Sequence, residues 1–381
     1  MSDITTKSKL PGPAPRYTQI VEGLPATVPF VGPEAQERAR GQQFRARIGA
    51  NESVFGPSPK AIAAMQHAAN EVWRYGDPEN HELRHALAAH HSVAPENIVV
   101  GEGIDGLLGF LARLLVQPGA PVVTSDGAYP TFNYHVAGFG GRLVKVPYKH
   151  DAEDLDALVT AANAEQAALV YVSNPDNPMG SWHPADAITA MIDALPGDAV
   201  FCLDEAYIEF APEGTAPPID VSIENVIRFR TFSKAHGMAG ARIGYAIAHA
   251  DLIRSFDKIR NHFGVNRIAQ AGALAALHDQ AWLDDVAGRV SASRGRIAAI
   301  ARDNGLIPLP SAANFVAIDC GGDGDFARKV LDGLIERGCF VRMPFVAPQD
   351  RCIRVTAGTS GDLDVFAETL PQALADARRA S

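Results

Sequence analysis

The sequence predicts an α/β protein, with a mostly parallel sheet in a large domain and a smaller α+β domain after it. Between about residues 60 and 250, short apolar runs alternate with helical patterns, which is the rhythm of βαβ units. Runs such as 200–203 are apolar at successive positions, as is typical of a strand covered on both faces. After about residue 280 this alternation ends, and a long helical stretch begins the smaller domain.

The elements of the large domain follow in chain order. Ser58 and Pro59 supply a capping side chain and a proline at the first helical position, which predicts a helix over 60–72. The expected strands are 97–100, 121–126, 142–148, 167–175, 199–207, 225–234 and 243–248. The expected helices between them are 81–91, 106–115 and 184–195.

The two ends of the chain are expected to form the smaller domain. Its C-terminal part holds a long helix at 282–305, a second helix at 326–338, and apolar segments at 313–320, 340–344 and 352–358. The first fifty residues are rich in proline, glycine and charge, which predicts an irregular arm. We therefore assign 1–50 to an arm that is part of the small domain, 51–284 to the large domain and 285–381 to the small C-terminal domain.

Composition excludes several classes of protein. The 34 basic and 44 acidic residues give a net charge of −10, which argues against a nucleic-acid partner. The four cysteines are widely spaced and form no C-x-x-C pair, so we expect no metal site and a reducing compartment. The first residues lack the apolar core of a signal peptide, and no stretch approaches the roughly 18 apolar residues of a membrane span. These features predict a cytoplasmic enzyme with no membrane partner.

A glycine motif points to a bound phosphate. Residues 101–106 read G-x-G-x-x-G, follow an expected strand and open an expected helix. Asp126 lies twenty residues beyond Gly106, so the pattern satisfies the dinucleotide-binding fingerprint. The same turn would present backbone N–H groups and the positive end of a helix dipole to any phosphate. The motif alone therefore leaves open which phosphate is bound.

The segment 229–245 favours a different cofactor from a dinucleotide. Lys234 lies between a strand and a glycine-rich turn, close to Thr231 and Ser233 and eight residues before Arg242. Any single lysine is usually a surface residue, but a lysine that forms an imine must be partly desolvated. Two hydroxyls and a fixed cation suit a phosphate monoester. A nicotinamide enzyme has no need of this set.

Two more strand ends supply polar groups. Asp204 and Tyr207 lie at the end of the strand 199–207, where a buried carboxylate would be costly unless it were paired. A protonated pyridine nitrogen is a natural partner, and at close range the pair is worth about 4 kcal/mol at an effective dielectric constant near 20. The loop 174–180 follows another strand; its Asn, Pro and Gly also suit a simple turn, but its position favours a site role.

Together these segments resemble a known family. SNPDNPMG at 173–180, LDEAY at 203–207 and FSKAHGMAGARIGY at 232–245 are similar, in order and spacing, to the class I/II aminotransferases of fold type I, which use pyridoxal 5′-phosphate (PLP). The likeness extends from about residue 50 to about residue 355. RYGDP at 74–78, PSAANFVAI at 310–318, FVRMP at 340–344 and IRVTAGT at 353–359 resemble the histidinol-phosphate aminotransferase branch.

The resemblance implies a role for each matching residue. Lys234 would hold PLP as a Schiff base and move a proton during the reaction, Asp204 would pair with the ring nitrogen, and Tyr129 would stack on the ring. Asn177 and Tyr207 would bond the ring O3′ atom. The groups that would hold the phosphate are the turn at Gly103, the N–H groups of Ile104 and Asp105, and Thr231, Ser233 and Arg242.

The resemblance also implies how substrates and a second subunit are bound. Arg354 would bind the substrate α-carboxylate through two parallel hydrogen bonds, beside Asn177. Arg342 would grip the phosphate of histidinol phosphate, with an exposed salt-bridging arginine as the alternative. Tyr75 resembles a tyrosine that reaches the cofactor phosphate of the neighbouring subunit, which implies a homodimer.

The sequence departs from this branch at two positions. Thr27 stands where the branch has a tyrosine that lines the substrate pocket, and Gly106 replaces an acidic residue. We therefore expect an amino donor that is either like histidinol phosphate or bulky and aromatic, and a 2-oxo acid acceptor such as 2-oxoglutarate. The alternatives are another PLP reaction of this fold, decarboxylation or elimination, and a non-enzymatic PLP-binding regulator. The chain has no basic DNA-binding module, which counts against the regulator.

Overall fold

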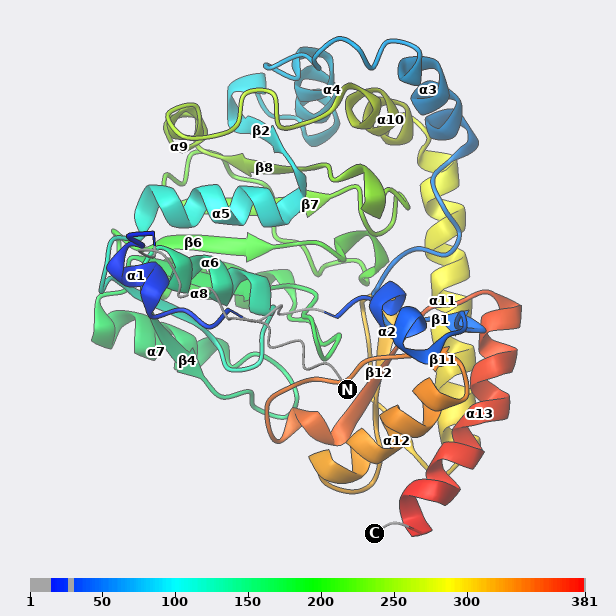
Figure 1. Ribbon diagram of the computed structural model, residues 1–381. Coiled ribbons are helices and arrows are strands. Elements are labelled where there is room, and N and C mark those ends of the chain that lie inside the picture. The colour runs from blue at the N-terminus through cyan, green and yellow to red at the C-terminus, as the bar shows by residue number, and fades with distance from the viewer. Residues whose placement is uncertain (1–14, 27–30, 380–381) are drawn as a thin grey trace, which may run out of the picture.

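The computed structural model describes residues 15–26 and 31–379 and is built around a seven-stranded sheet (Figure 1). The strand order is β2 (Ile98–Gly101), β8 (Gly244–Ala248), β7 (Val226–Thr231), β6 (Val200–Asp204), β5 (Leu169–Ser173), β3 (Pro121–Ser125) and β4 (Arg142–Val146). Neighbouring strands are parallel except at β8, which is antiparallel to both β2 and β7. The predicted strands and the predicted α/β class with a mostly parallel sheet are confirmed.

Helices cover both faces of this sheet, which is why its central strands are apolar at every position. One face packs against α5 (Gly103–Leu115), α6 (Pro130–Gly138) and α9 (Ala250–Phe256). The other face packs against two groups of helices. They are α7 (Leu155–Glu165) and α8 (Ala185–Ala194), and α3 (Pro59–Ala69), α4 (His81–His91) and α10 (Arg267–Leu277). As the capping signal predicts, Ser58 Oγ accepts a hydrogen bond from the Ala61 N–H (3.1 Å) at the start of α3.

A second, antiparallel sheet lies in the C-terminal part of the chain. Its strands are β12 (Cys352–Thr356), β10 (Phe315–Asp319) and β9 (Ile307–Pro308), in that order. It shares a core with α12 (Gly324–Glu336), α13 (Ser360–Arg379) and the end of α11 (Gln280–Asp303). The short strand β1 (Ala46–Arg47) pairs in parallel with β11 (Cys339–Phe340), so the N-terminal segment joins this part of the molecule.

The first fifty residues differ from the prediction of an irregular arm. They contain α1 (Gln19–Glu22) and α2 (Pro33–Arg40) as well as β1. The apolar pattern does not predict α2, because this helix is almost entirely polar and shows no apolar period. Its boundaries do carry local signals, with Pro33 at the first helical position and Gly41 at φ +70° after the last. Glu34 and Glu37 of this helix both bind Arg47 of β1.

The composition also bears on the cysteines, on membrane-spanning helices and on metal sites. All four cysteines are buried and free. The helices of the described chain include none that is long and apolar enough to cross a membrane. Over residues 15–26 and 31–379, no cluster of His, Cys, Asp and Glu side chains is suited to hold a metal ion.

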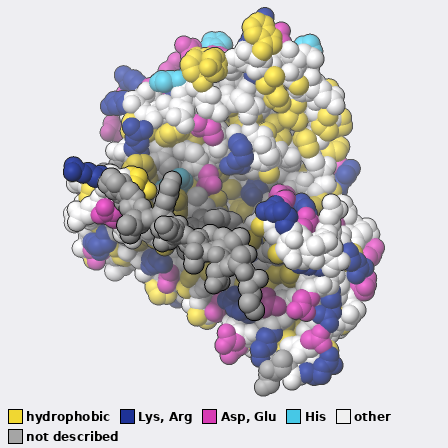
Figure 2. Space-filling view, viewed as in Figure 1, with side chains coloured by type: hydrophobic (Ala, Val, Ile, Leu, Met, Phe, Trp, Pro, Cys, Tyr) yellow, Lys and Arg dark blue, Asp and Glu magenta, His cyan; other side chains and the backbone are white. Residues whose placement is uncertain are grey.

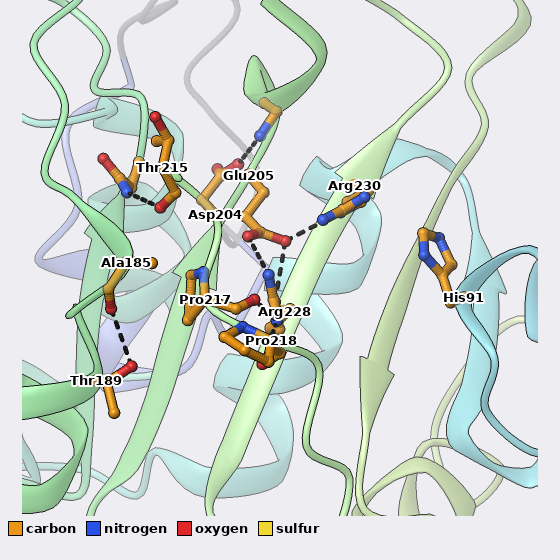
Figure 3. A network of polar contacts seen from close by, with 12 residues as sticks. His91, Ala185, Thr189, Asp204, Glu205, Thr215, Pro217, Pro218, Arg228 and Arg230 are labelled. Atoms are coloured by element: carbon orange, nitrogen blue, oxygen red, sulfur yellow. Dashed lines mark hydrogen bonds and ion pairs between the residues drawn. The ribbon is translucent and has the colours of Figure 1, made fainter. Parts of the chain in front are cut away.

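A buried ion cluster ties the ends of β6 and β7 together on the face of the sheet opposite α5 (Figure 3). Glu205 follows β6 and is 1% exposed. Arg228 of β7 binds both its carboxylate oxygens, with Nε at 3.0 Å from Oε2, and donates to the Pro217 carbonyl oxygen at 2.9 Å. Arg230 Nε donates to Glu205 Oε2 at 3.0 Å. The Glu205 N–H also donates to the Phe229 carbonyl oxygen at 2.9 Å.

We predict that Glu205→Ala lowers the free energy of unfolding by about 3–5 kcal/mol, because it leaves two guanidinium groups without their buried carboxylate. Urea unfolding followed by circular dichroism measures the change. Glu368→Ala is the matched control, since Glu368 pairs with Arg45 at the surface, where both side chains are about half exposed. That variant should lose about 1 kcal/mol or less. Equal losses in the two variants would contradict the prediction.

Candidate active site

Most of the predicted site residues line one pocket. It has a volume of about 350 Å³ and lies where the carboxyl ends of β5, β6 and β7 meet the start of α5. Residues from the C-terminal sheet close it from the other side. The predicted residues that line it are Ile104, Asp105, Tyr129, Asn177, Asp204, Tyr207, Thr231, Ser233, Lys234, Arg242, Arg342 and Arg354. Two predicted residues, Gly103 and Tyr75, are not among its lining residues.

Lys234 lines the pocket from the turn that follows β7. Its Nζ donates to the Asn51 carbonyl oxygen at 3.1 Å and lies 5.6 Å from the centre of the Tyr207 ring. Burial, together with the nearby cations Arg354 and Arg242, lowers the pKa of Lys234 from 10.5 to about 8. At pH 7 about a tenth of such an amine is neutral, far more than for an ordinary lysine. The amine is therefore available as a nucleophile or base.

Asp204 ends β6 and points its carboxylate into the pocket. The Tyr171 hydroxyl donates to Oδ2 at 2.7 Å, and the Ala206 N–H donates to Oδ1 at 3.0 Å. Burial raises the pKa of Asp204 to about 6, while these two hydrogen bonds oppose the rise. The carboxylate is thus ionised at neutral pH, is only 4% exposed, and has no cation bonded to it within the described chain.

The far end of the pocket is rich in hydrogen-bond donors. The helix α5 starts without a side-chain cap, so the first N–H groups of this helix, at Ile104 and Asp105, are not capped by a side chain. Arg242 Nη1 donates to Ser233 Oγ at 3.3 Å, and Thr231 Oγ1 accepts from the Ser233 N–H at 3.0 Å. These groups converge on the place where a phosphate would complement the helix dipole.

The glycine at position 103 is required by this packing. Gly103 has φ +80°, and a Cβ atom there would lie 2.5 Å from Arg242 Nη2. A side chain at this position would therefore displace the arginine from the donor-rich end of the pocket. The glycine of the motif therefore allows the Arg242 guanidinium to approach the start of α5 closely. Asp126, the acidic residue of the dinucleotide fingerprint, instead pairs with Lys145 at 3.2 Å and does not line the pocket.

Arg354, on β12, faces the pocket from the C-terminal sheet. Its Nη1 donates to Asn177 Oδ1, and Asn177 Nδ2 in turn donates to the Tyr207 hydroxyl at 3.4 Å. Within residues 15–26 and 31–379, no carboxylate pairs with Arg354, and its buried Nε atom has no hydrogen-bond partner. Burial lowers the pKa of Arg354 to about 10, so it remains a cation at neutral pH. A desolvated cation without a carboxylate is suited to bind an acidic ligand group.

Tyr129 and Arg342 line the pocket on other sides. The Tyr129 hydroxyl donates to Asp105 Oδ1 at 3.1 Å, and burial, with Asp105 beside it, raises the pKa of Tyr129. Arg342 Nη2 donates to the Val31 carbonyl oxygen at 2.9 Å, and the Arg342 backbone forms an isolated antiparallel bridge with Arg354. Arg342 therefore both lines the pocket and holds the N-terminal segment against it.

Three further positions singled out in the sequence are Tyr75, Thr27 and Gly106. Tyr75 is 77% exposed, and its ring centre lies 4.8 Å from that of Phe263, so a single chain does not bring it to the pocket. Thr27 lies outside the described residues. Beside Gly106, the carboxylate of Glu102 occupies the adjacent space, with Oε2 3.3 Å from the place of a Cβ atom. An acidic group is thus present here, supplied by a neighbouring position.

The sequence interpretation missed two residues that hold the site together. Tyr171 is fully buried on β5 and bonds Asp204, as described above. Asn51, in the left-handed conformation at φ 56°, donates from Nδ2 to the Tyr207 hydroxyl at 3.0 Å and accepts from Lys234. A tyrosine in an otherwise aliphatic strand could have signalled a buried polar partner. Nothing local marks Asn51, because its contacts come from residues far along the chain.

Comparisons with known proteins define the class. The chain is 32% identical over 365 residues to a histidinol-phosphate aminotransferase of Moorella thermoacetica, covering 95% of this chain and 94% of that protein. It is 35% identical over 326 residues to an aromatic amino acid aminotransferase of Mycolicibacterium paratuberculosis, covering 84% and 89%. The crystal structure of a histidinol-phosphate aminotransferase from Sinorhizobium meliloti in complex with PLP matches with a TM-score of 0.93 and 54% identity, over 96% and 98% of the two chains.

The protein is therefore a PLP-dependent aminotransferase. Residues 47–370 match the family model of aminotransferase class I and II, and the chain belongs to this family. The dinucleotide interpretation of the glycine motif is thereby wrong. Transamination, rather than another PLP reaction or a regulatory role, is the activity that the relatives share.

We predict that Lys234 in the cofactor-free protein reacts with an amine reagent such as trinitrobenzenesulfonate with a midpoint near pH 8. The sign follows from burial, which disfavours the charged form, so the neutral amine is present at lower pH than for a lysine with a pKa of 10.5. Mass spectrometry of the modified peptides at each pH gives the rates. The exposed Lys149 serves as the reference, and a Lys234 profile that coincides with it would contradict the lowered pKa.

Proposed function

We propose that this aminotransferase takes its amino group from a donor with an aromatic, imidazole or other bulky side chain. The acceptor is a 2-oxo acid such as 2-oxoglutarate. The observation that carries the binding of both substrates is Arg354, a desolvated cation beside Lys234 with no carboxylate partner in the described chain. Amino acids and 2-oxo acids share the acid group that such an arginine binds. The relatives named for histidinol phosphate and for aromatic amino acids support the donor class.

The groups in the pocket fit PLP from end to end. The uncapped N–H groups of α5, with Arg242 and Ser233, would hold the phosphate, and Asp204 would face the ring nitrogen. Lys234 lies between these two ends, where it would carry the cofactor, and Tyr129 would cover the ring. Asn177 and Tyr207 would bond the ring oxygen. When bound, PLP supplies an electron sink for the bonds of the amino-bearing carbon.

The chain's own residues then have distinct tasks. Asp204 is ionised above about pH 6 and would keep a proton on the ring nitrogen, since a carboxylate stabilises that positive charge. Lys234, with a pKa of about 8, would take the proton from the amino-bearing carbon of the donor and would deliver it to the cofactor carbon C4′. Tyr207 is fixed by Asn51 and Asn177, so its hydroxyl holds one orientation beside that lysine.

The pocket can accept either a carboxylate or a phosphate. Histidinol phosphate bears a phosphate ester where an amino acid bears its α-carboxylate, so the same cations must bind both groups. Arg342 and Arg354 lie on directly opposed backbone positions, which places two guanidinium groups on one side of the pocket. We therefore propose that Arg342 assists Arg354 with the larger, doubly charged phosphate, while its bond to Val31 holds the N-terminal segment.

We also propose a homodimer. Hydrophobic side chains gather over α3 and α10 at the upper right of Figure 2, where Ile62 is 39% exposed. Beyond α3, Val72, Trp73 and Tyr75 are 62%, 76% and 77% exposed. An exposed apolar surface of this kind is typical of a subunit interface. In such a dimer Tyr75 would reach the phosphate end of the partner's pocket.

The donor class is tested by mixing the PLP-loaded protein with single donors and following the cofactor absorbance. We expect phenylalanine, tyrosine or histidinol phosphate to react with a kcat/KM at least about tenfold above alanine and aspartate. Because Thr27 replaces the tyrosine of the branch, at least one unphosphorylated donor should rival histidinol phosphate. A preference of about a thousandfold for histidinol phosphate, about 4 kcal/mol in the transition state, would contradict this expectation. A preference for alanine or aspartate would overturn the donor class.

We predict that Arg354→Lys lowers kcat/KM for every donor and for the acceptor by about a hundredfold, because a lysine cannot form the two parallel hydrogen bonds that a guanidinium offers an acid group. Steady-state kinetics with one aromatic and one small donor measure the effect. Arg296→Lys is the control, since Arg296 pairs with Asp364 at the surface. Loss with only one class of donor would instead make Arg354 a specificity residue.

A further inference from the structure

An exposed aromatic ring stands at the mouth of the pocket. Thirteen large hydrophobic side chains in the described residues are exposed, and among them only Phe345 lines the pocket. Its exposed fraction is 64%, although Met343, two residues before it, is 4% exposed. Apart from the Tyr129 ring, the binding and reacting groups described above act through polar atoms, whereas the Phe345 side chain offers apolar area to a ligand.

The backbone that carries Phe345 is fixed on both sides. Before it, Arg342 forms the antiparallel bridge with Arg354, and Met343 and Pro344 are buried. After it, the Val346 carbonyl oxygen accepts from the Asp350 N–H at 3.0 Å. Arg351 then binds Asp151 (2.7 Å) and Asp319 (2.7 Å), which anchors the end of the segment to both parts of the molecule. The ring is therefore exposed because the packing of its neighbours directs it outward.

The segment that carries Phe345 also packs against the loop that contains Gly127. A Cβ atom on Gly127 would lie 3.3 Å from the Val346 side chain, so the glycine allows this close approach. Gly127 and Tyr129 belong to one loop, and Tyr129 is the tyrosine predicted to cover the cofactor ring. Phe345 thus lies at the rim between that loop and the arginines that would bind the acid group of the donor.

We propose that Phe345 is a specificity-determining residue that packs against the side chain of the amino donor and favours an aromatic or imidazole ring. This inference rests on the proposed donor class. A donor whose acid group is bound at Arg354, and whose amino group faces the cofactor carbon that Lys234 would hold, must direct its side chain toward the remaining wall or mouth of the pocket. Ring-to-ring packing adds to the apolar area buried, so the contact discriminates against small donors.

Binding of acids that cannot react tests the contact apart from catalysis. The PLP-loaded wild type, Phe345→Ala and Phe345→Trp are titrated with 3-phenylpropionate and with pentanoate, and the cofactor absorbance or protein fluorescence gives Kd. We expect Phe345→Ala to weaken 3-phenylpropionate about tenfold, to change pentanoate less than about threefold, and Phe345→Trp to restore the aromatic acid. Ile307→Ala is the matched control, since Ile307 is 63% exposed and lies away from the pocket.

Donor kinetics provide the second measurement. Phe345→Ala should raise KM for phenylalanine or histidinol phosphate about tenfold with kcat little changed, and should leave KM for glutamate within about twofold. Equal weakening of all acids would overturn the proposal, since Phe345 would then act through Arg342 or Arg354. Unchanged binding together with a shift to monomer in sedimentation would also overturn it, because the ring would be a subunit contact. A wild type that rejects aromatic donors would overturn the donor class itself before any variant is made.

Discussion

The site depends on the junction between the parallel strands β6 and β7. Asp204 ends one strand opposite Phe229 of the other, and the chain of β7 then continues to Lys234. Behind this junction, Glu205 is held by Arg228 and Arg230 of the neighbouring strand (Figure 3). Successive strand residues point to opposite faces, so the charged cluster lies on one face of the sheet and the pocket on the other. The cluster thus fixes the two strand ends that carry the reacting groups.

Electrostatics within the pocket follow from burial and from the position of each charge. A desolvated lysine beside two arginines loses its proton easily, while a carboxylate with two hydrogen-bond donors remains ionised despite its burial. At neutral pH the pocket therefore holds a lysine that is partly neutral and a carboxylate that is ionised. Under the proposed function, Arg242 would bind the cofactor phosphate and Arg354 would bind the acid group of the substrate.

Under the proposed function, substrate choice would involve a different part of the molecule from the chemistry. The reacting groups come from strands and helix ends of the central sheet, whereas Arg342, Phe345 and Arg354 come from the C-terminal sheet and the segment beside it. A change in that segment would then alter which donor is held without moving Lys234 or Asp204. This separation is consistent with relatives that share the fold but are named for different amino donors.

The sequence by itself determined the α/β class and the order of the central strands along the chain, because strand periodicity is a local property. The motifs around Asn177, Asp204 and Lys234 also indicated the family to which the chain belongs. It did not reveal the polar helix α2, which has no apolar period. The tertiary structure alone decided that Asn51 and Tyr171 support the site, that Arg354 has no carboxylate partner in the described chain, and that Phe345 stands exposed at the mouth of the pocket. These properties depend on which distant residues meet, and such contacts are fixed only when the two sheets pack together.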